Sequence, residues 1–206
     1  MIETKNKLFL IFAIIVLVFM TLIIQKGPVL NEKQPILQSG KALKKPLEII
    51  DFQLIDQKNQ LFTKNDLKDH FTLLFFGYTN CPDVCPSTIY KLSQMKKKIN
   101  KDLPEKNLEI VFITLDPERD TTNRLHEYMN FFDSTMIGLT GDISEIVKLS
   151  ANLSVFFQRI NKEDGYDFNH TASIFIINQE AQLGASLSPI SSLEMLEEDI
   201  KILLTK

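Results

Sequence analysis

Residues 71–92 read FTLLFFGYTNCPDVCPSTIYKL, and this stretch decides the predicted fold. The apolar run over 71–77 ends at glycine, which is typical of a strand buried on both faces of a sheet. The two cysteines of the chain, Cys81 and Cys85, follow this strand directly. Apolar residues then recur at helical spacing over 83–99, so we expect the cysteines at the start of a helix.

The elements around this stretch alternate between strand and helix. A second buried strand is predicted at 108–115, and right-handed crossovers would place it parallel and adjacent to the strand at 71–77. Further predicted elements are an entering strand or hairpin arm at 47–56, helices around 125–132, 143–153 and 193–203, and strands at 155–160, 173–177 and 183–187. This order predicts an α/β domain with the thioredoxin-like fold.

The composition narrows the class of protein. The chain has 206 residues, of which 44% are hydrophobic and 24% charged, as expected of a folded protein rather than a disordered one. A net charge of −3 with no large basic block argues against a nucleic-acid partner. Two cysteines are too few for a disulfide-rich scaffold or a four-thiolate zinc site. We therefore expect the cysteines to act as one pair.

The N-terminal segment has a different character from the rest of the chain. Residues 8–24 (LFLIFAIIVLVFMTLII) form an apolar run at the lower length limit of a membrane-spanning helix. The run is longer than a signal-peptide core, and no small-residue cleavage site follows it. We therefore predict an uncleaved N-terminal transmembrane anchor in residues 1–26, a Pro- and Gly-containing tether over 27–46, and a folded domain over 47–206.

This organisation predicts a location. The stretch ahead of Lys7 is short and contains an acidic residue, so it leaves no room for a mitochondrial transit peptide. A bacterial inner membrane is therefore the simpler expectation. We expect a single-pass protein whose soluble domain faces the periplasm.

The predicted position of the cysteines has chemical consequences. The free N–H groups and the positive dipole end of a helix N-terminus favour thiolates. A spacing of four residues places both sulfurs on one face, where they can form a reversible disulfide or hold one soft metal ion. A static disulfide staple is the alternative, but closing so short a loop contributes little to stability.

One of the three histidines is the candidate third group. His70 is predicted to be an exposed turn residue and His126 to be solvated, whereas His170 ends a loop directly before the strand at 173–177. In a thioredoxin-like sheet that loop faces the cysteines and usually carries a cis-proline, yet none of the eight prolines lies near His170. Two thiolates and one imidazole suit copper(I), whereas zinc would need a fourth ligand such as water.

Four strings in the chain resemble the Sco (SenC) family in order and spacing: FGYTNCPDVCPSTI, VFITLDPERDT, MIGLTGD and the FNHT histidine. The resemblance covers about residues 47–190 together with the N-terminal anchor. It implies a membrane-anchored, thioredoxin-like copper chaperone that helps to assemble the Cu-A centre of cytochrome c oxidase. It also implies that Cys81, Cys85 and His170 are the copper ligands. The implied partners are the copper-bearing oxidase subunit and a copper donor or thiol reductant.

Two other functions stay open at this point. A thiol–disulfide oxidoreductase would use Cys81 and Cys85 as a redox pair to reduce cysteines of the copper-receiving subunit, and would be an enzyme, which a chaperone is not. A redox or copper sensor acting through a partner is the weaker alternative.

The chain departs from the family pattern in two places. Asn169 stands directly before the histidine where the family commonly has Asp, while Asp167 lies two residues earlier. The glycine of the last hairpin is displaced to Gly184, so we expect the register of that hairpin to differ.

Acidic residues follow the second buried strand at the cysteine end of the sheet. Asp116, Glu118 and Asp120 are predicted to cap the helix that starts near Thr121 and to pair with nearby arginines, Arg119 or Arg124. Alternatively, Asp116 or Asp120 orients the metal loop or a partner. Beside the cysteines, Tyr78 and Asp83 are predicted to be wall and helix-start residues rather than ligands.

Overall fold

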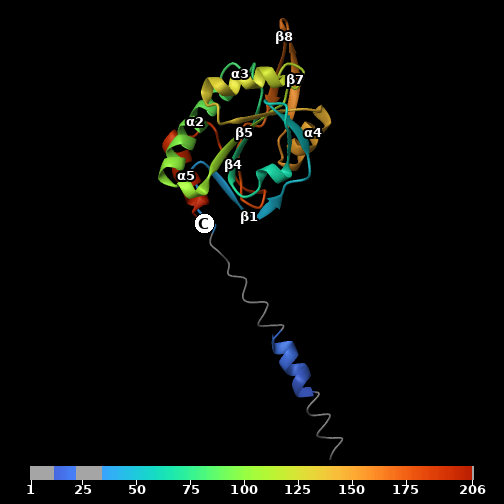
Figure 1. The fold of residues 1–206 in the computed structure, drawn as a ribbon, viewed down its shortest axis with the longest axis vertical. Coiled ribbons are helices and arrows are strands. Elements are labelled where there is room, and N and C mark those ends of the chain that lie inside the picture. The colour runs from blue at the N-terminus through green and yellow to red at the C-terminus, as the bar shows by residue number, and fades with distance from the viewer. Residues whose placement is uncertain (1–11, 22–33, 206) are drawn as a thin grey trace, which may run out of the picture. The chain divides into compact units, whose positions relative to one another are not determined.

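A computed structural model of the chain describes residues 12–21 and 34–205 (Figure 1). The chain divides into two units, residues 1–33 and 34–206. In the first unit residues 12–21 are helical, and the rest of the predicted anchor at 8–24 lies outside the described residues. Among the described residues, no helix combines the length and the apolar character that a membrane span needs.

The second unit is an α/β domain. Its helices are α2 (Val84–Asp102), α3 (Thr122–Phe132), α4 (Ile143–Asn152) and α5 (Leu193–Leu204), with short 3-10 turns at Lys64–Leu67 and Pro104–Lys106. Its strands are β1 (Gly40–Glu48), β2 (Gln53–Asp56), β3 (Leu61–Thr63), β4 (Phe71–Gly77), β5 (Leu108–Thr114), β6 (Ile137–Thr140), β7 (Phe157–Lys162), β8 (Gly165–His170), β9 (Ile174–Ile177) and β10 (Gln182–Leu187).

Eight of these strands form one mixed sheet in the order β1-β10-β9-β4-β5-β6-β2-β3. Strands β4 and β5 are parallel and directly paired, from Phe71 opposite Leu108 to Gly77 opposite Thr114, which confirms the predicted parallel, adjacent arrangement. Strand β9 pairs antiparallel with both β4 and β10, so the predicted C-terminal hairpin is also confirmed. The register of that hairpin shifts between Leu183 and Ala185, at the displaced Gly184.

Helices cover both faces of the sheet, as the continuous apolar runs predict. Leu73 and Phe75 of β4 belong to a core shared with α2, α3 and α5, whereas Leu74 and Phe76 belong to a second core that includes α4. All four side chains are at most 1% exposed. Strand β4 is therefore the centre of the domain, and its carboxyl end holds the cysteine loop in a fixed place.

The folded unit begins earlier than residue 47, so the predicted end of the tether at residue 46 is wrong. Strand β1 pairs with β10 along the edge of the sheet, and its register shifts between Ala42 and Leu47. The irregularity contains Pro46. Proline is tolerated at sheet edges and bulges, and for this reason the proline-containing sequence does not mark a linker here.

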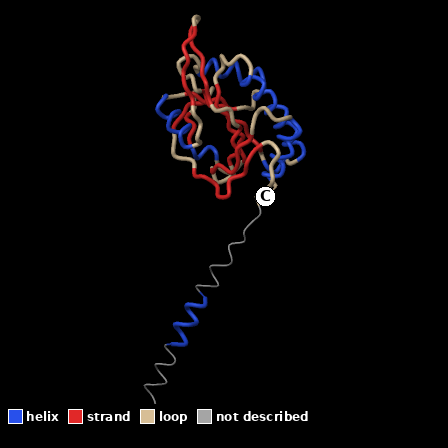
Figure 2. The backbone as a smooth tube through the Cα atoms, turned by 180° about the vertical axis from the view of Figure 1, so that it is seen from behind, coloured by secondary structure: helices blue, strands red, loops and turns tan. Residues whose placement is uncertain are grey.

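The segment before His170 also differs from the prediction. Instead of a loop, Gly165–His170 forms β8, which pairs antiparallel with β7 in a separate two-stranded sheet. Figures 1 and 2 show this hairpin reaching outward from the body of the domain. His170 lies at its inner end, opposite Phe157.

Candidate metal centre

The cysteine loop connects the end of β4 to the start of α2. Cys85 lies in the first turn of the helix and is fully buried, whereas Cys81 lies in the preceding loop and is partly exposed. The side chain of Asp83, the N-cap residue, makes no capping hydrogen bond. The backbone N–H groups of Asp83 and Cys85 instead favour the thiolate form of Cys81, which lowers its pKa.

Gly77 makes room for the Cys85 sulfur. A Cβ atom added at Gly77 would lie 2.8 Å from the Sγ atom of Cys85 and 2.8 Å from a ring carbon of Phe112. Both separations are shorter than real Cβ contacts allow, so the absence of a side chain at Gly77 is what lets the buried thiol pack against the end of β4.

The two thiols differ in acidity. A hydrogen bond from Cys85 is the largest cause that lowers the pKa of Cys81, to about 5, and the backbone N–H groups of Asp83 and Cys85 lower it further. The same bond and burial both raise the pKa of Cys85. At neutral pH the pair therefore consists of a partly exposed thiolate, Cys81, and a buried thiol, Cys85.

His170 lies against this pair. Its Nε2 atom is 3.9 Å from the Cys85 Sγ atom, and its Nδ1 atom is 3.1 Å from the backbone carbonyl oxygen of Thr171. Because a carbonyl oxygen only accepts, the Nδ1 atom carries the proton of that bond, and Nε2 keeps its lone pair toward the sulfur. Such a bond on the far nitrogen is what orients a metal-binding imidazole. Here the backbone carbonyl oxygen of Thr171 accepts that bond, whereas Asn169 is exposed.

Cys85 thus lies beside His170 and is hydrogen-bonded to Cys81, but the three predicted donors do not form a ligand cluster in this structure. Within residues 12–21 and 34–205, no group of three or more His, Cys, Asp or Glu side chains has the geometry to hold a metal ion. The donor set itself fits copper, since thiolates and a neutral imidazole are ligands that soft Cu(I) prefers.

Tyr78 forms one wall of the site and contacts the hairpin. Its ring centroid lies 5.4 Å from that of Phe168 and 6.0 Å from that of His170, edge to face in the second case. Its hydroxyl donates to the carboxylate of Asp167, and burial followed by this bond raises the pKa of Tyr78. The predicted wall role of Tyr78 is confirmed, but its bond to Asp167 was not predicted.

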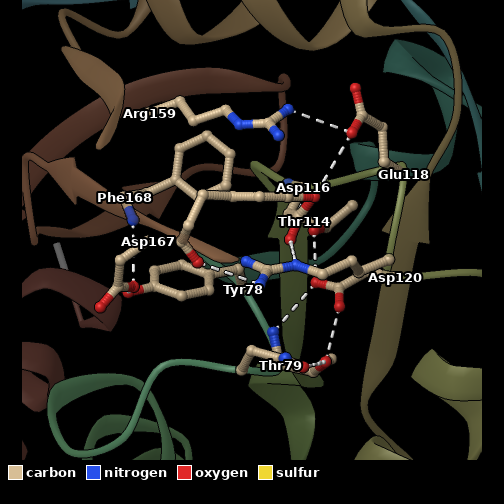
Figure 3. A network of polar contacts seen from close by, with 12 residues as sticks. Tyr78, Thr79, Thr114, Asp116, Glu118, Asp120, Arg159, Asp167 and Phe168 are labelled. Atoms are coloured by element: carbon tan, nitrogen blue, oxygen red, sulfur yellow. Dashed lines mark hydrogen bonds and ion pairs between the residues drawn. The ribbon is translucent and has the colours of Figure 1, made fainter. Parts of the chain in front are cut away.

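Asp120 fixes the first part of the cysteine loop, as the alternative prediction held. Its fully buried carboxylate accepts from the Thr79 N–H (2.9 Å), the Thr79 hydroxyl (2.5 Å) and the Thr114 hydroxyl (2.5 Å). Figure 3 shows these bonds joining the loop to the end of β5. The N-cap of α3 is Thr121, whose side chain accepts from the Arg124 N–H, so the predicted capping role for the acidic residues is wrong.

Asp116 and Glu118 act on the β7–β8 hairpin. Asp116 pairs with Arg119, as predicted, and accepts from the Tyr166 hydroxyl at 2.8 Å, while exposed Glu118 pairs with Arg159 at 3.2 Å. The guanidinium groups of Arg119 and Arg159 lie over the Tyr166 ring, at 3.8 Å and 3.5 Å from its centroid. The acidic residues thereby bind Tyr166 and Arg159 of the hairpin, and Figure 3 shows the pair of Glu118 and Arg159.

The other two histidines lie outside this site. His70 is not an exposed turn residue: its side chain is 12% exposed and its Nε2 atom lies 3.4 Å from a carboxylate oxygen of Glu109. The neighbouring polar sequence gave no sign of this burial. His126 is exposed, as predicted, and contacts Asn130 on its own helix.

Comparison with known families agrees with the fold and the motifs. The SCO1/SenC family model matches residues 40–205. The chain belongs to the SCO1/SenC family. Among its relatives, the SCO2-like protein of Rickettsia felis is 37% identical over 131 residues, and the mitochondrial SCO2 homolog of Mus musculus is 31% identical over 153 residues. These matches cover 62% and 73% of this chain, and the chain spans only 63% and 60% of the length of these relatives.

Solved SCO1/SenC-like structures support the α/β, thioredoxin-like fold. Arabidopsis thaliana ScoI with copper bound matches with a TM-score of 0.72 and 30% identity, covering 76% of this chain and 98% of that one. Bradyrhizobium japonicum ScoI with copper bound matches with a TM-score of 0.67 and 34% identity, covering 75% of this chain and 98% of that one. The predicted family and domain fold are confirmed.

Proposed function

We propose that this chain binds copper through Cys81, Cys85 and His170 and delivers it for assembly of the Cu-A centre of cytochrome c oxidase. The observation that carries the proposal is the approach of His170 Nε2 to the Cys85 sulfur at 3.9 Å, with the other ring nitrogen bonded to the Thr171 carbonyl. Family membership and the relatives solved with copper bound support the choice of metal.

The acidity of the thiols sets the order of events. Cys81 is the thiolate at neutral pH, and it lies on the exposed side of the pair, where an arriving Cu(I) ion meets it first. Cys85 then exchanges its proton for the metal, and His170 supplies its neutral nitrogen. Both thiols have to be reduced for this to occur, so oxidation to a disulfide would block loading. Release to the copper-bearing oxidase subunit is an exchange of these ligands for those of the recipient.

We further propose that residues 8–24 anchor the chain in a bacterial inner membrane as a single pass, with the domain facing the periplasm. The support is the length and apolar character of this run. Fractionation of cells before and after alkaline washing, with protease added to intact spheroplasts, tests it. The domain should stay with the membrane and be cleaved from outside. A soluble or protected domain would contradict the proposal.

Copper titration of the reduced, full-length chain tests delivery. We expect one Cu(I) ion per chain, and His170→Ala should weaken the affinity by about 10–100-fold, because one of the ligands is lost. His126→Ala is the matched control, since His126 is exposed on α3 and should leave the affinity unchanged. Absence of stoichiometric uptake, or equal affinity of the His170→Ala chain, would overturn the proposal.

A second candidate function, thiol–disulfide exchange, is favoured by the unequal thiols. The Cys81 thiolate would attack a disulfide of the recipient, forming a mixed disulfide and releasing one recipient thiolate. Cys85 would then attack the Cys81 sulfur, which releases the second recipient thiol and leaves a Cys81–Cys85 disulfide. Two electrons pass to the recipient, and a thiol reductant has to restore the pair.

The His170→Ala chain separates the two functions. If exchange is the function, this chain should reduce a disulfide-containing peptide of the recipient and support oxidase assembly in cells as well as the unmodified chain does. If delivery is the function, the same chain should fail to support assembly although its cysteines still exchange.

A further inference from the structure

The hairpin that carries His170 depends on contacts with the rest of the domain. Within the part of the chain that the structure describes, strands β7 and β8 pair only with each other, outside the eight-stranded sheet. A two-stranded hairpin is marginally stable in water when isolated. The position of the His170 ring relative to the cysteines is therefore set by whatever joins the hairpin to the cysteine loop.

Tyr78 joins the hairpin to the cysteine loop. Its backbone carbonyl accepts from the Cys81 N–H at 3.2 Å, within the cysteine loop. Its ring packs on Phe168 and His170 of β8, and its hydroxyl donates to Asp167 of the same strand. Tyr78 is only 3% exposed, so these contacts are made in a largely closed environment.

Asp167 is fixed within the hairpin as the partner of Tyr78. The oxygen that accepts from Tyr78 also accepts from the Phe168 N–H at 3.0 Å, and its other oxygen pairs with Lys162 across the hairpin. The carboxylate is thus held rigidly by β7 and β8 while it binds a residue of the cysteine loop. Figure 3 shows Tyr78, Asp167 and Phe168 grouped together.

We propose that Tyr78 and Asp167 are positioning residues, which hold the hairpin against the cysteine loop so that the His170 imidazole is in place before copper arrives. The proposal rests on the proposed copper function. In this chain Asn169, directly before the histidine, is exposed, and the carboxylate two residues earlier makes the contact with the loop. Pre-positioning raises copper affinity because less ordering remains to be done on binding.

The test uses the reduced full-length chain and Cu(I) in competition with a chromophoric chelator. Tyr78→Phe keeps the aromatic ring and removes the hydroxyl, and Asp167→Ala removes the acceptor. Each should weaken Cu(I) affinity about tenfold. Asp167→Asn keeps an oxygen acceptor for Tyr78 and should retain more affinity than Asp167→Ala. Glu163→Ala removes a negative charge from the exposed turn of the same hairpin and should have no effect.

A second readout on the metal-free chain reports the ring position directly. Nuclear Overhauser contacts between the rings of residue 78 and His170 should weaken in Tyr78→Phe and Asp167→Ala. Those between Phe52 and Phe62, whose ring centroids lie 6.4 Å apart in the second core, which does not contain Tyr78, should remain. If the contacts between residue 78 and His170 are lost while the core contacts remain, the result supports positioning rather than general destabilisation.

The outcomes separate the two proposals. Unchanged affinity and unchanged ring contacts in Tyr78→Phe and Asp167→Ala would overturn the positioning role. If the Asp167→Asn chain loses as much Cu(I) affinity as the Asp167→Ala chain, the role of the Tyr78 hydrogen bond is contradicted. If the unmodified chain takes up no copper, the copper function is overturned, and the ring contacts of the metal-free variants alone then decide whether Tyr78 and Asp167 position His170.

Discussion

The cysteine loop and the β7–β8 hairpin supply ligands to one proposed site, but they are held in different ways. The loop lies between the central strand β4 and helix α2, and the buried Asp120 fixes it by accepting two hydrogen bonds from Thr79 and one from Thr114 of β5. The hairpin is a separate two-stranded sheet held mainly by side chains: Tyr78, Asp116 and Arg119. We call the loop the rigid half of the site, and the hairpin, whose position depends on side-chain contacts, the adjustable half.

The largest effect is expected when the support of the rigid half is removed. Asp120→Ala leaves the Thr79 N–H and two hydroxyl groups without their acceptor in a buried position. We expect the free energy of unfolding to fall by about 3 kcal/mol, measured by urea denaturation. Asp83→Ala is the control, because its exposed side chain makes no capping bond and should change the stability by less than about 0.5 kcal/mol. Equal stabilities of the two variants would contradict the account of the loop.

Gly77→Ala tests whether the missing side chain at Gly77 makes room for the buried thiol of Cys85. The added methyl group would meet the Cys85 sulfur and Phe112, so we expect a loss of about 1–3 kcal/mol from overpacking. Gly184→Ala is the matched control, since its added Cβ would lie 3.7 Å from the Ile176 carbonyl oxygen, an ordinary contact. Thermal unfolding of both chains measures the difference. Full stability of Gly77→Ala would show that the thiol is not packed there.

A smaller and local effect is expected in the hairpin. Tyr166→Phe removes the hydroxyl that binds Asp116 and should reduce stability by about 1 kcal/mol. Amide hydrogen exchange should speed up over residues 157–170 but not in β4, because the hairpin opens separately from the sheet. Tyr90→Phe, on the exposed surface of α2, serves as the control. Faster exchange throughout the sheet would mean that the two halves are not separate.

The smallest predicted effect concerns the protonation state of the two thiols, Cys81 and Cys85. Because the pKa of Cys81 is lowered to about 5, its thiolate fraction should rise as the pH passes upward through about 5 and fall on acidification. Alkylation of the metal-free reduced chain with iodoacetamide should follow that midpoint at Cys81, while buried, protonated Cys85 stays nearly unreactive. In Cys85→Ala, which lacks the main hydrogen-bond donor, the midpoint should move up. A midpoint of about 8–9 in the unmodified chain would contradict this account.

The sequence predicted the rigid half far better than the adjustable half. The apolar runs of β4 and β5 and the helical spacing of α2 reflect burial by near neighbours in sequence, so the element types, the parallel pairing and the cysteine position were predicted. Strand β6, with four residues and Gly138 among them, was not predicted as a strand.

The hairpin could not be predicted in the same way. Strand β8 reads GYDFNH, and Gly, Asp and Asn are depleted in strands, which explains why the segment was predicted to be a loop. The bond between Tyr78 and Asp167 joins positions 89 residues apart and leaves no local pattern in the sequence. The position of His170 before the strand at 173–177 and the family resemblance both indicated this residue, but the contacts that hold it in place became visible only in the fold.

The most direct test of the central claim is X-ray absorption at the copper edge of the Cu(I)-loaded, full-length chain. If the rigid half supplies two sulfur ligands and the adjustable half one nitrogen, the spectrum should require two sulfur neighbours and one imidazole nitrogen, and His170→Ala should remove the nitrogen alone. A sulfur-only shell that is the same in the unmodified and His170→Ala chains would contradict the account.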